Sequence, residues 1–208
     1  MADDYREIPV PPGHLAEVVT YVEMRSPPAE PPPPGPWRFE RRERPDVDWY
    51  LGLYRESGEE WLWYSRLLMA RAAVAEILAD PAVEVFALRR EGADVGLGEL
   101  SFREPGEVEI SFFGVVRAEF GAGAGRWLMA KLLERAWREK PARVWLHTCT
   151  FDHPVALPFY LARGFKAYKR TVGVYTDPRL GGAVSREASR RVPVIAPDAG
   201  GDGSKSVC

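Results

Sequence analysis

Six residues in the middle of the chain, Phe120 to Gly125, read FGAGAG and separate two stretches of different pattern. Residues 107–116 alternate apolar and polar side chains, as a strand does, and residues 126–139 repeat apolar side chains at helical spacing. A glycine-rich turn at this place exposes the unpaired N–H groups of the first helical turn, which can bind an anion. Taken alone, the junction fits a phosphate-binding loop and a ligand-free turn equally well.

The stretches around this loop predict an α+β domain. Alternating residues cover 83–90, 94–103 and 107–116, and short turns join them at Glu91-Gly92-Ala93 and Pro105-Gly106. These strands are expected to form an antiparallel meander, followed by a strand-loop-helix-strand crossover. Further strands are expected over 37–44, 142–151 and 165–175, and helices over 46–56, 59–69, 70–79, 126–139 and 153–163. The order predicts a mixed, mostly antiparallel central sheet with helices on both faces.

The first 36 residues are expected to lie outside that domain. Residues 13–25 predict a short amphipathic helix that packs on the domain or on a second subunit. Its apolar stripe would consist of Leu15, Val18, Val19 and Val22. Residues 26–36, SPPAEPPPPGP, predict an extended linker. The domain is then expected over 37–195, with a short edge strand at 192–195 and a disordered tail over 196–208.

The composition argues against several classes of protein. A net charge of −2 offers no bulk attraction for nucleic acid or an anionic membrane. The two cysteines, Cys149 and Cys208, argue against a disulfide framework and are compatible with a reducing cytoplasm. No apolar run approaches the ~20 residues of a membrane helix, and the acidic start MADDYREIPVPPG lacks the apolar segment of a secretory signal.

Two common phosphate-binding motifs do not fit the glycine loop. A P-loop ends in Gly-Lys-Ser/Thr, whereas this loop ends in Gly125-Arg126-Trp127. The dinucleotide motif GxGxxG would place its third glycine at Arg126 or Leu128, depending on the starting glycine. A nucleotide-binding protein is therefore the least favoured of the ligand-binding interpretations.

Two segments resemble signatures of the GNAT (GCN5-related N-acetyltransferase) superfamily. The loop from Phe120 to Gly125 is similar to the family's Gln/Arg-x-x-Gly-x-Gly/Ala motif between the fourth strand and the third helix. Residues 153–165 resemble a second signature, in which an Asn stands seven residues before a Tyr and Gly-Phe follows. Here His153 takes the Asn position and Tyr160 the Tyr position.

The resemblance covers about residues 37–175 and implies both a fold and a cofactor. The sheet is expected to splay between its fourth and fifth strands, at a bulge within 110–116 that Gly114 would ease. The implied cofactor is acetyl-CoA, bound as a co-substrate without a metal ion. Because Phe120 replaces the usual Gln or Arg, mainly backbone N–H groups are expected to hold the pyrophosphate. The implied contacts are Phe113, Gly114, Val115, Gly121, Ala122, Gly123, Ala124, Gly125, Arg126 and His153.

Acetyl transfer to an amine needs a base and an acid. The acceptor amine, an ammonium of pKa ~10.4, must lose a proton before it attacks, and the leaving CoA thiolate gains one. Glu109 is the expected base, directly or through water. Its position in the chain relative to the loop matches that of the family's catalytic Glu. The alternation of the strand places its side chain on the face opposite to that of Ile110 and Phe112. Glu107, at the start of the strand, is the weaker alternative. Tyr160, at the family's Tyr position, is the expected acid.

Two further side chains share one face of the strand over 142–151. His147 remains open as an auxiliary base. A Cys149–His147 acyl-enzyme is less favoured, because side chains two apart on a strand lie ~7 Å apart. The three histidines have no close Cys, Asp or Glu grouping and predict no metal site.

The acceptor is expected to be a small-molecule amine or an amine of a peptide or protein. Aromatic residues after the first strand of the domain would favour an apolar or cationic amine. They are Trp49, Tyr50, Tyr54, Trp61, Trp63 and Tyr64. A homodimer is also considered, through the predicted N-terminal helix. The leading interpretation is an N-acetyltransferase, and the alternative is a non-catalytic acyl-CoA-binding regulatory module on the same fold.

Overall fold

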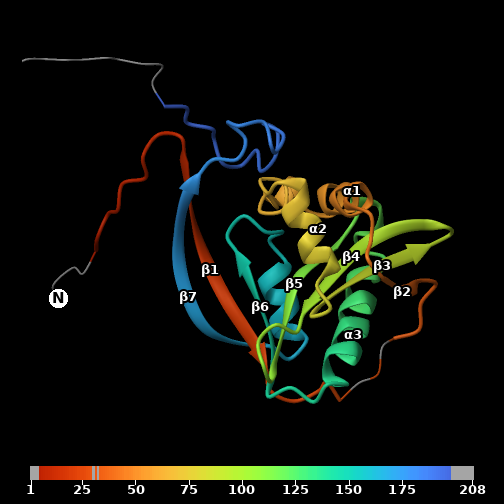
Figure 1. The fold of residues 1–208 in the computed structure, drawn as a ribbon. Helices are drawn as coiled ribbons and strands as arrows, with labels where there is room; N and C mark the ends of the chain where they lie inside the picture. Colours follow the sequence, from red (N-terminus) through yellow and green to blue (C-terminus); the bar gives the residue numbers. More distant parts are fainter. Residues whose placement is uncertain (1–4, 30, 32, 198–208) are drawn as a thin grey trace, which may run out of the picture.

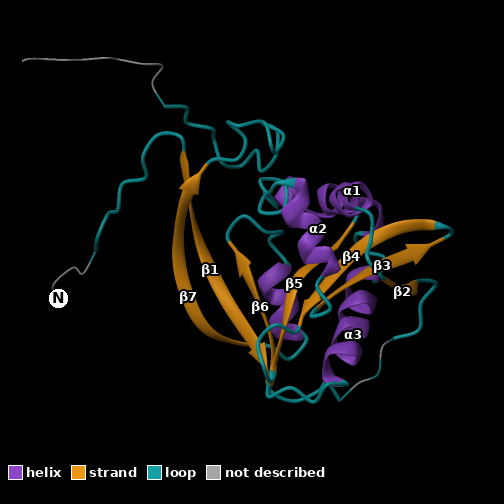
Figure 2. Cartoon of the chain, in the orientation of Figure 1, coloured by secondary structure: helices purple, strands orange, loops and turns teal. Residues whose placement is uncertain are grey.

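The computed structural model describes residues 5–29, 31 and 33–197, which form a curved sheet with helices on both faces (Figure 1; Figure 2). Within these residues the sheet has seven strands, in the order β2-β3-β4-β5-β6-β1-β7. The strands are β1 (His14–Met24), β2 (Arg38–Arg42), β3 (Val83–Arg90), β4 (Ala93–Ser101), β5 (Glu107–Val115), β6 (Arg143–Cys149) and β7 (Lys166–Thr176). The helices are α1 (Val47–Gly58), α2 (Arg71–Ala79), α3 (Ala124–Trp137) and α4 (Ala156–Ala162), with 3-10 turns η1 (Glu59–Trp61) and η2 (Arg117–Glu119). The predicted mixed, mostly antiparallel sheet is confirmed.

The predicted meander is formed by β3, β4 and β5. Its turns contain Gly92 and Gly106, whose φ angles of 88° and 78° favour glycine. β5 then pairs in parallel with β6, and this pairing covers only residues 107–109 of β5. From residue 110 onward, no described strand is hydrogen-bonded to the side of β5 that faces β6.

The N-terminal segment forms a strand, so the predicted helix over 13–25 is wrong. β1 pairs with β6 from Val19 to Met24 and with β7 along nearly its whole length. Figure 1 shows β1 and β7 side by side at one side of the molecule. The run VVTYV (18–22) consists of β-branched and aromatic residues, which favour strands. Pairing along both edges buries Val22 in the main core, which outweighs the helical spacing of the apolar residues.

Both faces of the sheet carry helices, as predicted. The core on one face contains Leu128 and Leu132 of α3 together with Ile110 of β5. The core on the other face contains Tyr54 of α1 together with Leu97 of β4.

The helix predicted over 59–69 is not formed. Only η1 is helical, and Leu62 then adopts a left-handed conformation with φ of 58°. The segment turns inward because Arg66 donates a hydrogen bond of 2.6 Å to Glu99, which is completely buried in β4. The guanidinium of Arg66 also lies over the ring of Phe112, 4.8 Å from its centroid. The two predicted helices on either side are confirmed, and the Asp46 carboxylate caps α1 as expected.

β5 contains one bulge, at Ser111. Glu99 pairs with Phe112 and Leu100 pairs with Ile110, which leaves Ser111 without a partner on β4. The bulge lies within the predicted range, although not at Gly114. It reverses the alternation of side chains, so Ile110 and Phe112 belong to the cores on opposite faces. The prediction that placed both on one face is wrong.

After β7 the chain packs back on the turn that follows β6. The nearly fully buried Arg179 donates hydrogen bonds to the Asp177 carboxylate and to the carbonyls of Ala188 and Val192. These bonds hold an irregular conformation, and the edge strand predicted at 192–195 is not formed. Of the tail predicted to be disordered, all but the first two residues lie outside the described part of the chain. Among the helices that are described, none is long and apolar enough to cross a bilayer.

Candidate active site

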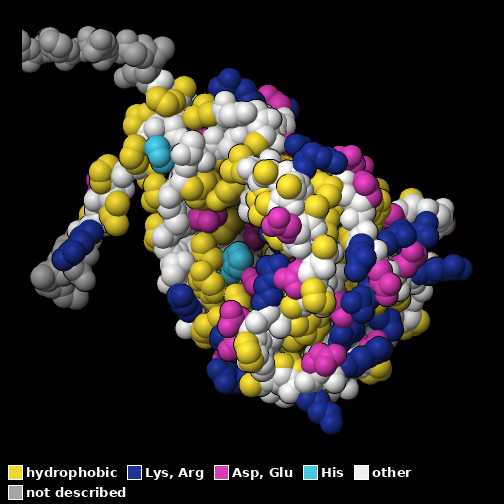
Figure 3. Space-filling view, viewed as in Figure 1, with side chains coloured by type: hydrophobic (Ala, Val, Ile, Leu, Met, Phe, Trp, Pro, Cys, Tyr) yellow, Lys and Arg dark blue, Asp and Glu magenta, His cyan; other side chains and the backbone are white. Residues whose placement is uncertain are grey.

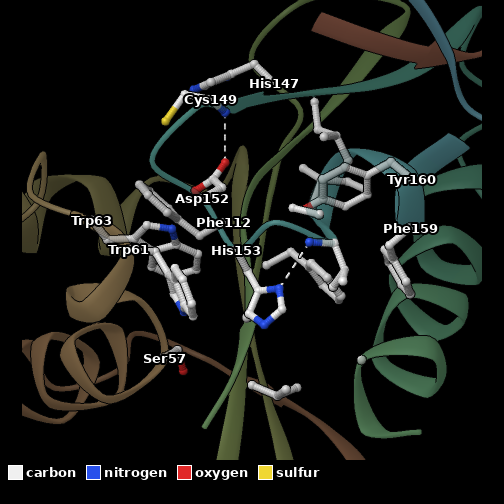
Figure 4. A pocket seen from close by; sticks show the side chains of 18 of the residues that line it. Ser57, Trp61, Trp63, Phe112, His147, Cys149, Asp152, His153, Phe159 and Tyr160 are labelled. Atoms are coloured by element: carbon white, nitrogen blue, oxygen red, sulfur yellow. Dashed lines mark hydrogen bonds between the residues drawn. The ribbon is translucent and has the colours of Figure 1, made fainter. Parts of the chain in front are cut away.

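A cavity of about 700 Å³ opens where β5 and β6 stop pairing. Figure 3 shows the face hollowed there, with acidic side chains and a histidine in the hollow. In the close-up of Figure 4, Trp61 and Trp63 lie on one side of the cavity, Phe159 and Tyr160 on the other, and His153 between them. The walls thus come from the turn after α1, from β5 and β6, from the glycine loop and from α4.

The glycine loop leads directly into α3. Gly121 and Gly123 have φ angles of 77° and 94°, a region that favours glycine. The helix begins at Ala124, two residues earlier than predicted, and no side chain caps its start. The N–H groups of its first turn therefore have no partner inside the helix and no side-chain acceptor. This arrangement favours an anion at the helix start.

Eight of the ten predicted cofactor contacts line the cavity. They are Phe113, Gly114, Val115, Gly121, Gly123, Gly125, Arg126 and His153. The two others, Ala122 and Ala124, do not line it. Ala124 is completely buried in the core under α3.

Gly114 makes room for a tryptophan of the cavity wall. A Cβ atom at this position would lie 2.9 Å from Cη2 of Trp63 and 3.1 Å from Cβ of Ser57. The absence of a side chain at Gly114 therefore lets Trp63 pack against β5. This packing is a different role from easing the bulge, for which the sequence suggested this glycine.

An aromatic contact crosses the opening near the loop. The ring of His153 lies edge-to-face with both Trp61 and Phe120, at centroid distances of 4.6 Å and 5.4 Å. The backbone N–H of Val155 donates a 3.1 Å hydrogen bond to His153 Nδ1. Because Nδ1 accepts this bond, the neutral ring carries its proton on Nε2.

Glu109 does not line the cavity directly, but it lies beside a residue that does. Its Oε1 atom is 3.9 Å from Nδ1 of His147, which lines the cavity with a half-exposed side chain. Burial raises the pKa of Glu109 above its usual range, and the nearby His147 counteracts this in part. The two groups form a carboxylate–imidazole pair whose imidazole faces the cavity.

Tyr160 lines the opposite wall. Its side chain is nearly buried among aromatic rings, with the Phe113 centroid 6.0 Å away and the Phe165 centroid 6.2 Å away. Burial raises the pKa of Tyr160, and the charge of Asp152 adds to the effect. The hydroxyl is therefore kept protonated at neutral pH and can donate a hydrogen bond into the cavity.

Cys149 also lines the cavity, and its environment disfavours a nucleophilic role. Burial raises the pKa of its thiol, as do the negative charges of Asp152 and Glu17. The thiolate is the reactive form of cysteine, so this thiol stays protonated and unreactive. The Asp152 carboxylate is held by the Thr148 hydroxyl at 2.6 Å and by the Cys149 N–H at 2.9 Å.

Four of the six predicted acceptor-site aromatics line the cavity, namely Tyr54, Trp61, Trp63 and Tyr64. The other two have structural roles. Tyr50 is buried and donates a 2.5 Å hydrogen bond to Glu99, and Trp49 donates one of 2.8 Å to Asp94.

Three lining carboxylates were missed from the sequence: Glu17, Glu119 and Asp152. Glu119 is buried and bound by the Trp37 indole at 2.9 Å and by Arg90. Glu17 lies on β1, which sequence reasoning placed outside the domain. A local signal existed for Asp152 and Glu119, which stand next to the His153 motif and the glycine loop.

Solved structures share this fold. An acetyltransferase structure of the GNAT family from Novosphingobium aromaticivorans DSM 12444 gives a TM-score of 0.58 at 15% identity, covering 83% of this chain and 71% of that one. An aminoglycoside acetyltransferase from an uncultured soil metagenomic sample, in complex with trehalose, gives 0.55 at 17% identity, covering 68% and 96%. A functionally unknown conserved protein from Staphylococcus epidermidis ATCC 12228 gives 0.55 at 15% identity; 79% of this chain covers 64% of that one. Such identities show the fold alone.

A glycine loop at a helix start and His147 with its neighbour Glu109 thus meet at one cavity, in a fold that solved acetyltransferase structures share. No curated protein matches the chain. The model of the acetyltransferase (GNAT) family matches residues 36–165, which is more than half of the chain. The chain belongs to the GNAT family of acetyltransferases, as its two motifs suggested.

Proposed function

We propose that this protein transfers an acetyl group from acetyl-CoA to a primary amine. One observation carries the proposal: a single cavity is lined by the start of α3, by the free edge of β5, by His147 and by Tyr160. An anion-binding element, a strand edge, a base and an acid therefore meet at one place. Membership in the GNAT family supports acyl transfer in general terms.

The chain offers groups that fit acetyl-CoA, which would supply the acetyl group as an activated thioester. The uncapped N–H groups at the start of α3 would bind the pyrophosphate, with Arg126 as an added cation. A Cβ on Gly121 would meet no atom within 4 Å, so a ligand can approach the backbone there. The free edge of β5 at Phe113–Val115 would bind the amides of the pantetheine arm.

Transfer forms one C–N bond and breaks one C–S bond, so a proton must leave the amine and another must reach the sulfur. His147, which faces the cavity, accepts the proton of the amine, and Glu109 stabilises the imidazolium or takes the proton onward. The 3.9 Å separation is longer than a hydrogen bond, and such contacts commonly shorten when substrate binds. The Tyr160 hydroxyl donates to the leaving sulfur.

The second candidate is a non-catalytic module that binds acyl-CoA. Phe120 and His153 favour it, because they replace the Gln or Arg and the Asn of the two family motifs. In the catalytic proposal these rings move aside or stack against the ligand.

Thiol release from acetyl-CoA in the presence of a panel of primary amines tests the proposal, with CoA binding measured by calorimetry in parallel. An acetyltransferase releases thiol in an amine-dependent manner. CoA binding without amine-dependent thiol release on any amine would instead identify the module.

A further inference from the structure

Glu17 contributes a carboxylate to the end of the cavity that is built by β1. Tyr21 of β1 pairs with His147 of β6 and stands four residues after Glu17. Residues an even number apart on a strand share a face, so Glu17 lies on the same face of the sheet as His147. Cys149, Tyr64 and Ser65 line the same cavity. Among the described residues, no Lys or Arg forms an ion pair with Glu17; its hydrogen bond comes from the Tyr175 hydroxyl, at 3.4 Å.

Two aromatic rings accompany this carboxylate. Tyr64 and Tyr175 are stacked, with their centroids 4.7 Å apart. Burial is the main cause of the raised pKa of both phenols and of the Cys149 thiol. The negative charge of Glu17 raises each of these pKa values further. Three separate groups thus experience its negative field. Of the two rings, Tyr64 lines the cavity, and Tyr175 stacks behind it and donates to Glu17. A carboxylate without a cationic partner, beside a tyrosine ring in a cavity, is suited to bind an ammonium group.

The position of Glu17 separates it from the reaction centre. Four residues of strand span ~13 Å, so the Glu17 backbone is about that far along β1 from the partner of His147. A carboxylate this far along the strand would contact a part of the acceptor other than the amine that reacts at His147.

We propose that Glu17, with Tyr64 and Tyr175, forms a subsite for a second ammonium group, so that the acceptor is a dibasic amine. This inference rests on the proposed acetyl transfer for the reacting end of the acceptor. The subsite would hold the distal ammonium and place the proximal amine beside His147. The binding of the distal charge itself requires no chemical step.

The test uses two probes of equal chain length, 1,8-diaminooctane and 8-aminooctan-1-ol, which differ in the charge at the distal end. In the wild-type protein, kcat/KM for acetylation of the diamine should exceed that for the amino alcohol by about tenfold or more. Glu17→Gln should abolish this preference and leave the amino alcohol unchanged. Glu23→Gln, a charge-matched variant on the same strand that does not line the cavity, should retain it.

Calorimetric titration of both probes into the CoA-saturated protein separates the subsite from the chemistry. If the diamine binds more tightly than the amino alcohol and Glu17→Gln loses this preference, the subsite is supported. If no acetylated product forms at the same time, acetyl transfer is contradicted. Equal affinity for both probes in the wild-type protein, or a preference for the diamine that survives in Glu17→Gln, would overturn the subsite whatever the turnover.

Discussion

Glu109 combines two properties that suit the group behind His147 in the proposed proton transfer: partial burial and contact with the imidazole. Burial raises its pKa, so the basic form is present above the raised pKa and is lost as the pH falls through it. We expect kcat/KM to decline on the acid side with this pKa. Glu109→Gln should lower kcat by about 10²-fold or more and change the pH at which that decline occurs. The pH dependence of thiol release, measured with one amine, checks both effects.

Glu107→Gln is the matched control for Glu109→Gln. Glu107 stands two residues earlier on β5, forms an ion pair of 2.7 Å with Arg143, and does not line the cavity. Its substitution should leave kcat and the acid side of the profile unchanged. An identical acid decline in Glu109→Gln and the wild-type protein would contradict the role of Glu109.

Tyr160 can be altered by the loss of a single oxygen atom. Tyr160→Phe retains the ring that packs against Phe113 and Phe165 and removes the proton that the hydroxyl would donate. We expect kcat to fall by about 10- to 100-fold, with CoA affinity and thermal midpoint nearly unchanged. Rapid kinetics together with calorimetry measure these quantities. A wild-type kcat in this variant would exclude Tyr160 as the acid.

At the scale of elements, two glycine substitutions test whether CoA binds where the glycine loop joins α3. One crowds the ligand side of the helix start, and the other strains the backbone of the loop. Gly125 lies in the helix, where a Cβ would make an ordinary contact of 3.7 Å with the Phe113 ring. Gly125→Val should therefore fold normally and weaken CoA binding by about tenfold or more, because its methyl groups occupy the ligand side. Calorimetric CoA titration and thermal unfolding give the two numbers.

Gly123→Val serves as the contrasting variant, because the φ of Gly123 is 94° and valine is strained there. It should lose both thermal stability and CoA affinity. CoA affinity unaltered in Gly125→Val would argue against a pyrophosphate at the start of α3.

β1 can be tested with two valines of the same strand. Val22 is fully buried in the main core, whereas Val18 is 37% exposed. Val22→Asp should reduce the free energy of unfolding by about 3 kcal/mol or more, because it buries an unpaired carboxylate. Val18→Asp should change it by less than about 1 kcal/mol. Urea denaturation measures both, and equal losses would contradict the placement of β1.

Local signals explain which elements could be predicted from the sequence. The meander has short glycine turns between alternating strands, and α3 follows a loop whose glycines need left-handed angles, so neighbouring residues determine both. The helix predicted over 59–69 failed because its conformation depends on Arg66 reaching Glu99, a residue distant in sequence. The helix predicted over 13–25 failed because two later strands determine the conformation of that segment.

The residues of the candidate site also divide into those that local motifs predict and those whose place depends on distant strands. The loop glycines, His153 and Tyr160 could be found because they stand in motifs, and all line the cavity. The relation of Glu109 to the cavity, through His147, depends on how β5 and β6 align. Glu17 enters the cavity only because β1 is inserted between β6 and β7. No local pattern reports such an insertion.

At the scale of the whole molecule, the cavity exists because β5 and β6 pair over three residues and then stop. The uncapped start of α3, the free edge of β5, His147 and Tyr160 then all line one space. β1 also contributes Glu17 to the lining of that space, and the proposed subsite would link the N-terminal segment to acceptor binding. Among the strands, the cavity therefore depends on β1 as well as on β5 and β6.

The most direct test of acetyl transfer is mass spectrometry of the amine after incubation with acetyl-CoA and the protein. The wild-type protein should yield an amine heavier by one acetyl group, at a rate that rises with protein concentration. Gly125→Val, at equal concentration and subsaturating acetyl-CoA, should yield about tenfold less. Absence of the acetylated amine from the wild-type reaction under conditions where CoA binds, or equal yields from both proteins, would contradict acetyl transfer at this cavity.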